Sequence, residues 1–139
     1  MKFLLLLAVT LMMTTSIVGD DKEESKALDG TWRPATAELA GKPMPDQIVK
    51  SIKLILKDDR YTALVGEQKD EGTVKRDTGK SPRTMDITST QGRTMLAIYK
   101  LNGDTLTICY DISGKEYPKE FKTKPQSQLY LVEYKRDKP

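Results

Sequence analysis

Alternation with a period of two residues constrains the fold of this 139-residue chain more than any other feature. Ile52, Leu54 and Leu56 alternate with polar neighbours, and the same pattern recurs in short runs separated by turn residues. Successive side chains of a strand point to opposite faces, so the pattern predicts half-buried strands. Such strands at a spacing of roughly 8–12 residues are typical of an all-β sandwich or barrel.

Hairpin-length turns join nearly all of the expected strands, and Asn102-Gly103 is the strongest of these turn signals. No long helical pattern interrupts the series, which argues against parallel βαβ units. We therefore predict an all-β fold, an antiparallel up-and-down barrel of eight strands, because closure removes exposed strand edges. Strands are expected at 30–38, 52–57, 60–65, 71–76, 84–89, 94–101, 105–111 and 128–136, with a further short strand around Phe121.

Two local features qualify this series of strands. Pro34 predicts a bulge or another irregularity in the first strand, because proline cannot donate to a sheet ladder. Residues 46–51 are expected to form one short helical turn with Asp46 as its N-cap.

The first 19 residues are expected to be a secretory signal peptide. Lys2 precedes an apolar run at 3–13 and a tail of small residues at 14–19. The run is shorter than the roughly 20 apolar residues of a membrane-spanning helix. Cleavage is expected before Asp20, with a second possible frame at Thr14 and Ser16, and a buried N-terminal helix is the alternative interpretation.

This interpretation divides the chain into a signal peptide at 1–19, a solvated leader at 20–27, a barrel domain at 28–136 and a tail at 137–139. It predicts an exported protein, periplasmic or extracellular, with no stable membrane span after cleavage of the signal peptide.

Composition narrows the chemistry. The chain has no histidine, the commonest general base and the usual partner of a serine or cysteine nucleophile. Cys109 is the only cysteine, so it forms no internal disulfide and no zinc site, and burial in a strand is its expected state. The 23 basic and 20 acidic residues are interspersed, which argues against a nucleic-acid partner. We expect a protein that is not an enzyme, with no catalytic residue, metal or cofactor.

Gly30-Thr31-Trp32 opens the first expected strand and contains the only tryptophan. A G-x-W start followed by a strand meander resembles the lipocalin-like barrels. The resemblance implies that Trp32 plugs one end of the barrel and that an arginine from near the end of the chain packs across its ring. Arg136 has that location, and such a contact contributes about 0.5–2 kcal/mol. A core tryptophan and an unrelated surface arginine are the alternative.

A series of short motifs runs in order along almost the whole mature chain. The motifs are Leu28-Asp29-Gly30-Thr31-Trp32, Gly41-Lys42-Pro43, Asp70-Glu71-Gly72-Thr73, Asp86-Ile87-Thr88, Ile98-Tyr99, Gly103-Asp104-Thr105-Leu106, Ile108-Cys109 and Glu120-Phe121-Lys122-Thr123-Lys124-Pro125. The ordered series resembles a domain family expanded in planctomycete bacteria, which comprises exported proteins of uncharacterised function. The resemblance implies a lipocalin-like barrel and an exported location, and it transfers no catalytic or binding residue.

The interior of an eight-stranded barrel either fills with side chains or holds one small ligand. We predict a pocket at the end away from Trp32, with an apolar lining that carries hydroxyl groups, for an apolar, lipid-like or aromatic small molecule. A solid core made of the same residues is the alternative. The candidate lining residues are Tyr61, Ala63, Met85, Met95, Ala97, Tyr99, Tyr110 and Tyr130.

A different class of function also fits the sequence. The protein could be a structural or interaction module of the cell envelope or exterior, with an unidentified protein partner. Its working surface would then be the loops at Pro43–Pro45, Gly79–Pro82 and Gly114–Pro118.

Overall fold

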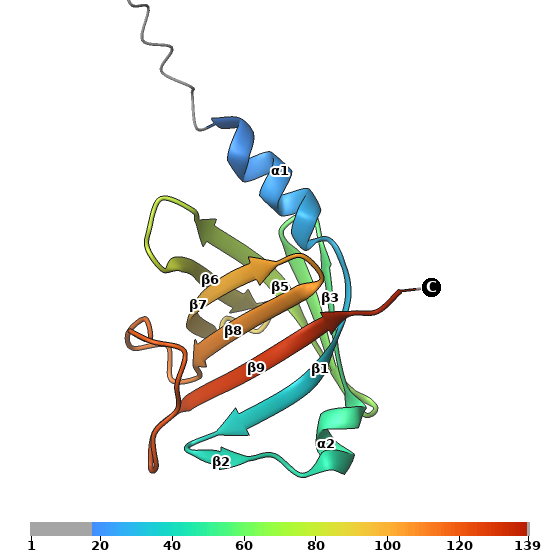
Figure 1. Cartoon of the computed structure of the whole chain (residues 1–139), viewed down its shortest axis with the longest axis vertical. Coiled ribbons are helices and arrows are strands. Elements are labelled where there is room, and N and C mark those ends of the chain that lie inside the picture. Colours follow the sequence, from blue (N-terminus) through green and yellow to red (C-terminus); the bar gives the residue numbers. More distant parts are fainter. Residues whose placement is uncertain (1–17, 139) are drawn as a thin grey trace, which may run out of the picture.

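The computed structural model describes residues 18–138, with side chains from Lys22 onward, so most of the expected signal peptide lies outside the described residues. Eight antiparallel strands form a closed up-and-down barrel, since each strand pairs with the next and β1 pairs with β9 (Figure 1). This confirms the predicted fold class. The barrel strands are β1 (Gly30–Leu39), β3 (Ile52–Lys57), β4 (Arg60–Val65), β5 (Gln68–Asp77), β6 (Arg83–Ser89), β7 (Thr94–Asn102), β8 (Thr105–Asp111) and β9 (Leu129–Arg136).

Most strand boundaries agree with the alternation in the sequence, and β3, β4 and β8 have the predicted bounds. A two-residue strand, β2 (Lys42–Pro43), pairs with the end of β1. The strand expected around Phe121 is wrong. β7 and β9 occupy both edges of β8, so the closed barrel leaves no edge for another strand there. Phe121 instead packs under Lys100, whose Nζ lies 4.5 Å from the ring centroid.

The strands close into a barrel with two local adjustments. The pairing of β1 with β9 shifts register between Pro34 and Thr36, which confirms the irregularity predicted at Pro34. In β5, a side chain on Gly72 would collide with the Thr88 carbonyl oxygen of β6. Glycine therefore permits a close approach of these two backbones that no other residue allows.

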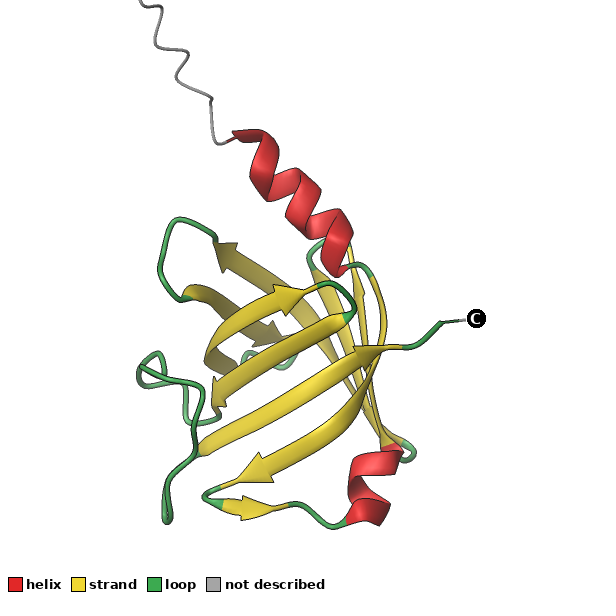
Figure 2. Cartoon of the chain, in the orientation of Figure 1, coloured by secondary structure: helices red, strands yellow, loops and turns green. Residues whose placement is uncertain are grey.

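The two helices lie at opposite ends of the barrel (Figure 2). The short helix α2 (Asp46–Ser51) forms where a helical turn was predicted, but its predicted cap is wrong. Pro45 occupies the N-cap position and makes no side-chain cap bond, and Asp46 is the first helical residue. A carboxylate there still interacts favourably with the positive end of the helix dipole.

The segment expected to be a solvated leader forms most of helix α1 (Val18–Leu28), and none of its described side chains before Leu28 is buried. Its glutamate, lysine and alanine residues are good helix formers, and Lys26 in the last turn complements the helix dipole. Leu28 is only 3% exposed and belongs to the barrel core.

The strand registers distinguish the two ends of the barrel. β1 begins and β9 ends at one end, which also carries the β3–β4, β5–β6 and β7–β8 turns and α1; we call it the Trp32 end. The opposite end, which we call the open end, carries α2, the β4–β5 and β6–β7 turns and the start of the β8–β9 connection.

Candidate functional site

Trp32 and Arg136 are direct cross-strand partners at the Trp32 end. The indole is fully buried and donates from Nε1 to the Leu28 carbonyl oxygen over 2.9 Å. The guanidinium carbon of Arg136 lies 4.3 Å from the indole centroid, within the range of a cation–π interaction. The predicted pairing is therefore present.

Arg136 also holds the C-terminus of α1. Its Nη2 donates to the Ala27 carbonyl oxygen over 2.6 Å, and its Nη1 donates to that of Asp29 over 2.8 Å. Carbonyls at a helix C-terminus have no helical partner and carry partial negative charge, so a guanidinium suits them. Gly30 permits this approach, because a Cβ there would lie 2.9 Å from Nη1.

A second cation joins α1 to the barrel wall. The Arg76 side chain is 6% exposed, and its Nη2 lies 3.1 Å from the Asp59 carboxylate. Glu24 of α1 lies 3.8 Å from Arg76 and 2.7 Å from Arg83. The buried ring of Tyr99 lies beside Arg76, and burial raises the pKa of its hydroxyl to about 12. The Trp32 end is thus held by one aromatic side chain and a network of charges.

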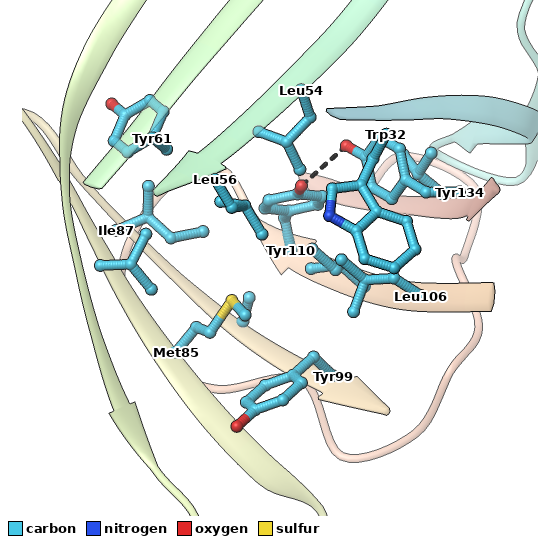
Figure 3. Packing of buried hydrophobic residues seen from close by; sticks show 14 of the residues in the cluster. Trp32, Leu54, Leu56, Tyr61, Met85, Ile87, Tyr99, Leu106, Tyr110 and Tyr134 are labelled. Carbon is cyan, nitrogen blue, oxygen red and sulfur yellow. Dashed lines mark hydrogen bonds between the residues drawn. The ribbon is translucent and has the colours of Figure 1, made fainter. Parts of the chain in front are cut away.

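A cavity of about 210 Å³ occupies the other part of the barrel interior. Val65 and Ile112 line it and are 45% and 39% exposed, so its mouth lies at the open end, as predicted. Figure 3 shows several inner lining side chains, together with Trp32. The lining residues are Ile52, Lys53, Leu54, Leu56, Tyr61, Ala63, Val65, Asp70, Val74, Met85, Ile87, Met95, Ile108, Tyr110, Ile112, Tyr130 and Tyr134.

Six of the eight predicted lining residues contribute to this cavity, but Ala97 and Tyr99 do not. Ala97 is fully buried, its cross-strand partners are Met85 and Tyr110, and it does not reach the cavity surface. The expectation of free space at Ala97 is therefore wrong, and the small lining residue is Ala63.

Polar groups enter the cavity lining at two places. Near the mouth, Tyr61 donates its hydroxyl proton to Asp70 over 2.8 Å, and burial and this bond raise its pKa. Sequence reasoning missed Asp70 as a lining residue. Its phase gives the signal, since it shares a strand face with Gly72 and with the buried Val74.

The second polar place is the hydroxyl pair of Tyr110 and Tyr134, whose oxygens lie 2.8 Å apart. The rings of Tyr110 and Tyr130 stack at 5.3 Å between centroids. Burial raises the pKa of Tyr110 and of Tyr134 well above the ordinary value, and that of Tyr130 to about 12. All three are uncharged near neutral pH. Tyr134 was absent from the predicted set, although its phase matches that of Tyr130.

Cys109 faces outward from β8 and is buried beneath the β8–β9 connection, where its Sγ lies 3.6 Å from the Lys122 carbonyl oxygen. Burial raises the pKa of the thiol, and the expected burial of Cys109 in a strand is confirmed. Over the described residues there is no group of three or more acidic, cysteine or histidine side chains that could hold a metal ion. Nor does the described part of the chain contain a helix long and apolar enough to span a membrane.

Comparisons of this chain with protein-family models, curated proteins and solved structures find no match. The class of the protein therefore rests on its own geometry. It is a closed antiparallel β-barrel with an apolar cavity that opens at one end.

Proposed function

We propose that this protein is an exported, non-catalytic β-barrel that binds one small apolar molecule in the cavity at its open end. The observation that carries the proposal is an apolar cavity of about 210 Å³ in the barrel interior. Protein interiors are close-packed and contain few voids larger than a water molecule, so a cavity of this size needs an explanation. Binding of a ligand supplies one.

The cavity volume limits the size of the ligand. An engineered apolar cavity of about 150 Å³ binds benzene, whereas sites for drug-sized ligands span roughly 300–1,000 Å³. The ligand portion inside this barrel is therefore about one substituted aromatic ring or a short aliphatic chain. A lipid-like ligand would place one chain end inside and keep the remainder beyond Val65 and Ile112.

The other parts of the proposal rest on the sequence. Export rests on the signal-peptide pattern, and cleavage before Asp20 would retain Glu24, Ala27 and Leu28, the residues of α1 that contact the barrel. The absence of catalysis rests on the lack of histidine and on the raised pKa of Tyr110 and Tyr134. Their hydroxyls stay protonated near neutral pH and therefore cannot act as general bases. Membership of the planctomycete lipocalin-like family remains our hypothesis, and the closed barrel agrees with it.

The loop-based alternative has no specific observation in its favour. The loops at 43–45 and 114–118 lie at or near the open end, whereas the loop at 79–82 joins β5 to β6 at the Trp32 end. The three loops therefore do not form one common surface.

The test fills the cavity without disturbing the barrel. In Ala63→Leu the added methylene groups enter the cavity, which should abolish binding and stabilise the fold by about 1–2 kcal/mol. Ala35→Leu is the matched control, because Ala35 is exposed at the β1 bulge. The probe is α-methylstyrene, an aromatic hydrocarbon, titrated into isotope-labelled protein and followed by NMR.

We expect saturable shifts at cavity residues in the parent and in Ala35→Leu, with dissociation constants between about 1 μM and 1 mM. Ala63→Leu should remain folded and show no saturation. Absence of saturable binding to the folded parent protein would reject the proposed function.

A further inference from the structure

The hydroxyl groups of Tyr110 and Tyr134 leave one proton without an acceptor. A phenol has one O–H donor and can also accept. The bond between the two oxygens uses one of the two protons. Across the part of the chain that the structure describes, neither hydroxyl has a second hydrogen-bond partner. Tyr110 and Tyr134 are only 6% and 3% exposed, so one O–H donor remains buried without an acceptor.

This donor belongs to the cavity, because both tyrosines line it. Leu54 and Leu56 line the same cavity as the pair, and Figure 3 draws the bond between the hydroxyls among these apolar side chains. Apolar side chains surround the pair, so they offer the remaining proton no acceptor. A buried donor without an acceptor is unfavourable, and a ligand that accepts from it removes that penalty.

We infer that the ligand carries an uncharged hydrogen-bond acceptor, such as a ketone, aldehyde or ester carbonyl, at the end that enters the cavity, and that the Tyr110–Tyr134 pair donates to it. The inference rests on the proposed function and specifies the ligand class. The rest of the inserted portion is apolar, since the surrounding lining is apolar.

The charges of the cavity favour an uncharged acceptor over a carboxylate. Lys53 and Asp70 are the charged members of the lining, and both lie near the mouth, at the starts of β3 and β5. A carboxylate beside Tyr110 and Tyr134 would be buried without a cation, which is strongly unfavourable. A fatty acid would therefore enter chain first, and its methyl end would leave the tyrosine donor unsatisfied.

The shared bond makes the two tyrosines redundant as donors. In Tyr110→Phe the hydroxyl of Tyr134 keeps its own proton, and the reverse holds in Tyr134→Phe. Each single variant therefore retains one donor, and only the double variant removes both. Tyr130→Phe removes the hydroxyl of a third lining tyrosine, whose ring stacks on Tyr110, and so tests whether that hydroxyl is the donor instead.

The test compares acetophenone with α-methylstyrene, in which a methylene group replaces the carbonyl oxygen. The measured quantity is the dissociation constant of the hydrocarbon divided by that of the ketone. We expect the double variant to lower this ratio by about threefold to tenfold relative to the parent, the effect of one hydrogen bond. The three single variants should change it by less than about twofold.

The outcomes separate this inference from the proposed function. If both probes bind and the ratio is the same in the parent and the folded double variant, the inference is overturned and the proposed function stands. If Tyr130→Phe alone lowers the ratio, the donor is a different hydroxyl and the inference is overturned. If neither probe binds the folded parent, the proposed function fails and the inference fails with it.

A second measurement uses only the parent protein, in case the double variant does not fold. Hydrogen bonding lowers the infrared carbonyl stretching frequency of a ketone. Bound acetophenone should absorb at a lower frequency than acetophenone in hexane. A frequency equal to that in hexane would overturn the inference.

Discussion

Replacing Arg136 by methionine tests how the Trp32 end is held together. The substitution keeps an unbranched stem over the indole and removes the guanidinium. The cation–π interaction contributes about 1 kcal/mol. Each hydrogen bond to the carbonyls of Ala27 and Asp29 contributes about 1 kcal/mol, below the usual range for charged donors. The reason is that the Arg136 side chain is 24% exposed, so water competes for the same hydrogen bonds. The ion pair with Asp104 lies at the surface and contributes little.

The expected loss in free energy of unfolding is therefore about 3 kcal/mol, measured by urea unfolding. Trp32 is the only tryptophan, so its fluorescence reports from the substituted site, and circular dichroism gives an independent curve. Arg136→Lys should lose about half as much, because lysine keeps the charge but lacks the planar fork that reaches two carbonyls. Lys135→Met is the control, since the Lys135 side chain is 56% exposed, and it should lose less than about 1 kcal/mol.

Two results would refute this reasoning. Arg136→Met could unfold at the same urea concentration as the parent, or Lys135→Met could be equally destabilising. Either would show that the guanidinium has no special part in holding α1 and Trp32. A positive result should be accompanied by faster amide exchange in the last turn of α1, whose carbonyls lose their partner.

Three further predictions concern Trp32, Tyr130 and the N-terminus. Trp32→Ala should cost about 3–5 kcal/mol by urea unfolding followed by circular dichroism, and a loss below about 1 kcal/mol would contradict its role in the core. Burial raises the pKa of Tyr130 from 10.0 in the unfolded chain to about 12 in the folded chain. Its contribution to the free energy of unfolding is therefore complete below pH 10 and is lost progressively as the pH rises to 12. Tyr130→Phe should flatten the stability curve in that window by up to about 1.4 kcal/mol per pH unit, and superimposable curves would exclude this contribution. Exported protein should begin near Asp20 by mass spectrometry, and recovery of Met1 would contradict the signal peptide.

The strands were predictable because one local rule governs them. Alternation assigned Tyr61, Met85 and Tyr110 to the barrel interior before any pairing was known. The pairing of Arg136 with the Trp32 ring came from the resemblance to lipocalin-like barrels and not from alternation. Alternation also predicts an inward position for Asp70, because Asp70 shares a strand face with the buried Val74. Side-chain phase therefore determines which residues face the interior.

Phase does not determine where space remains inside, and this is why Ala97 was misassigned. Both Ala63 and Ala97 face inward, and each lies between two larger cross-strand partners. Only Ala63 lines the cavity, on the half of β4 that leads to the open end. Helix α1 was missed for a related reason. Its segment is charged and mostly exposed, and it is attached by residues distant in sequence, among them Arg136, which lies more than 100 residues away.

The two ends of the barrel have opposite effects on stability, and this separates two ways of losing function. By the dependence seen in core-truncation variants, about 24 cal/mol per Å³, a cavity of about 210 Å³ corresponds to roughly 5 kcal/mol of forgone packing. That is comparable with what Trp32 and Arg136 contribute, and it is a large part of the roughly 5–15 kcal/mol that stabilises a typical domain. Substitutions at the Trp32 end should therefore weaken ligand binding by lowering the fraction of folded barrel, and excess ligand should offset this loss, because it binds only the native state. A substitution that fills the cavity, such as Ala63→Leu, should abolish binding while the barrel becomes more stable, and no ligand concentration should restore it.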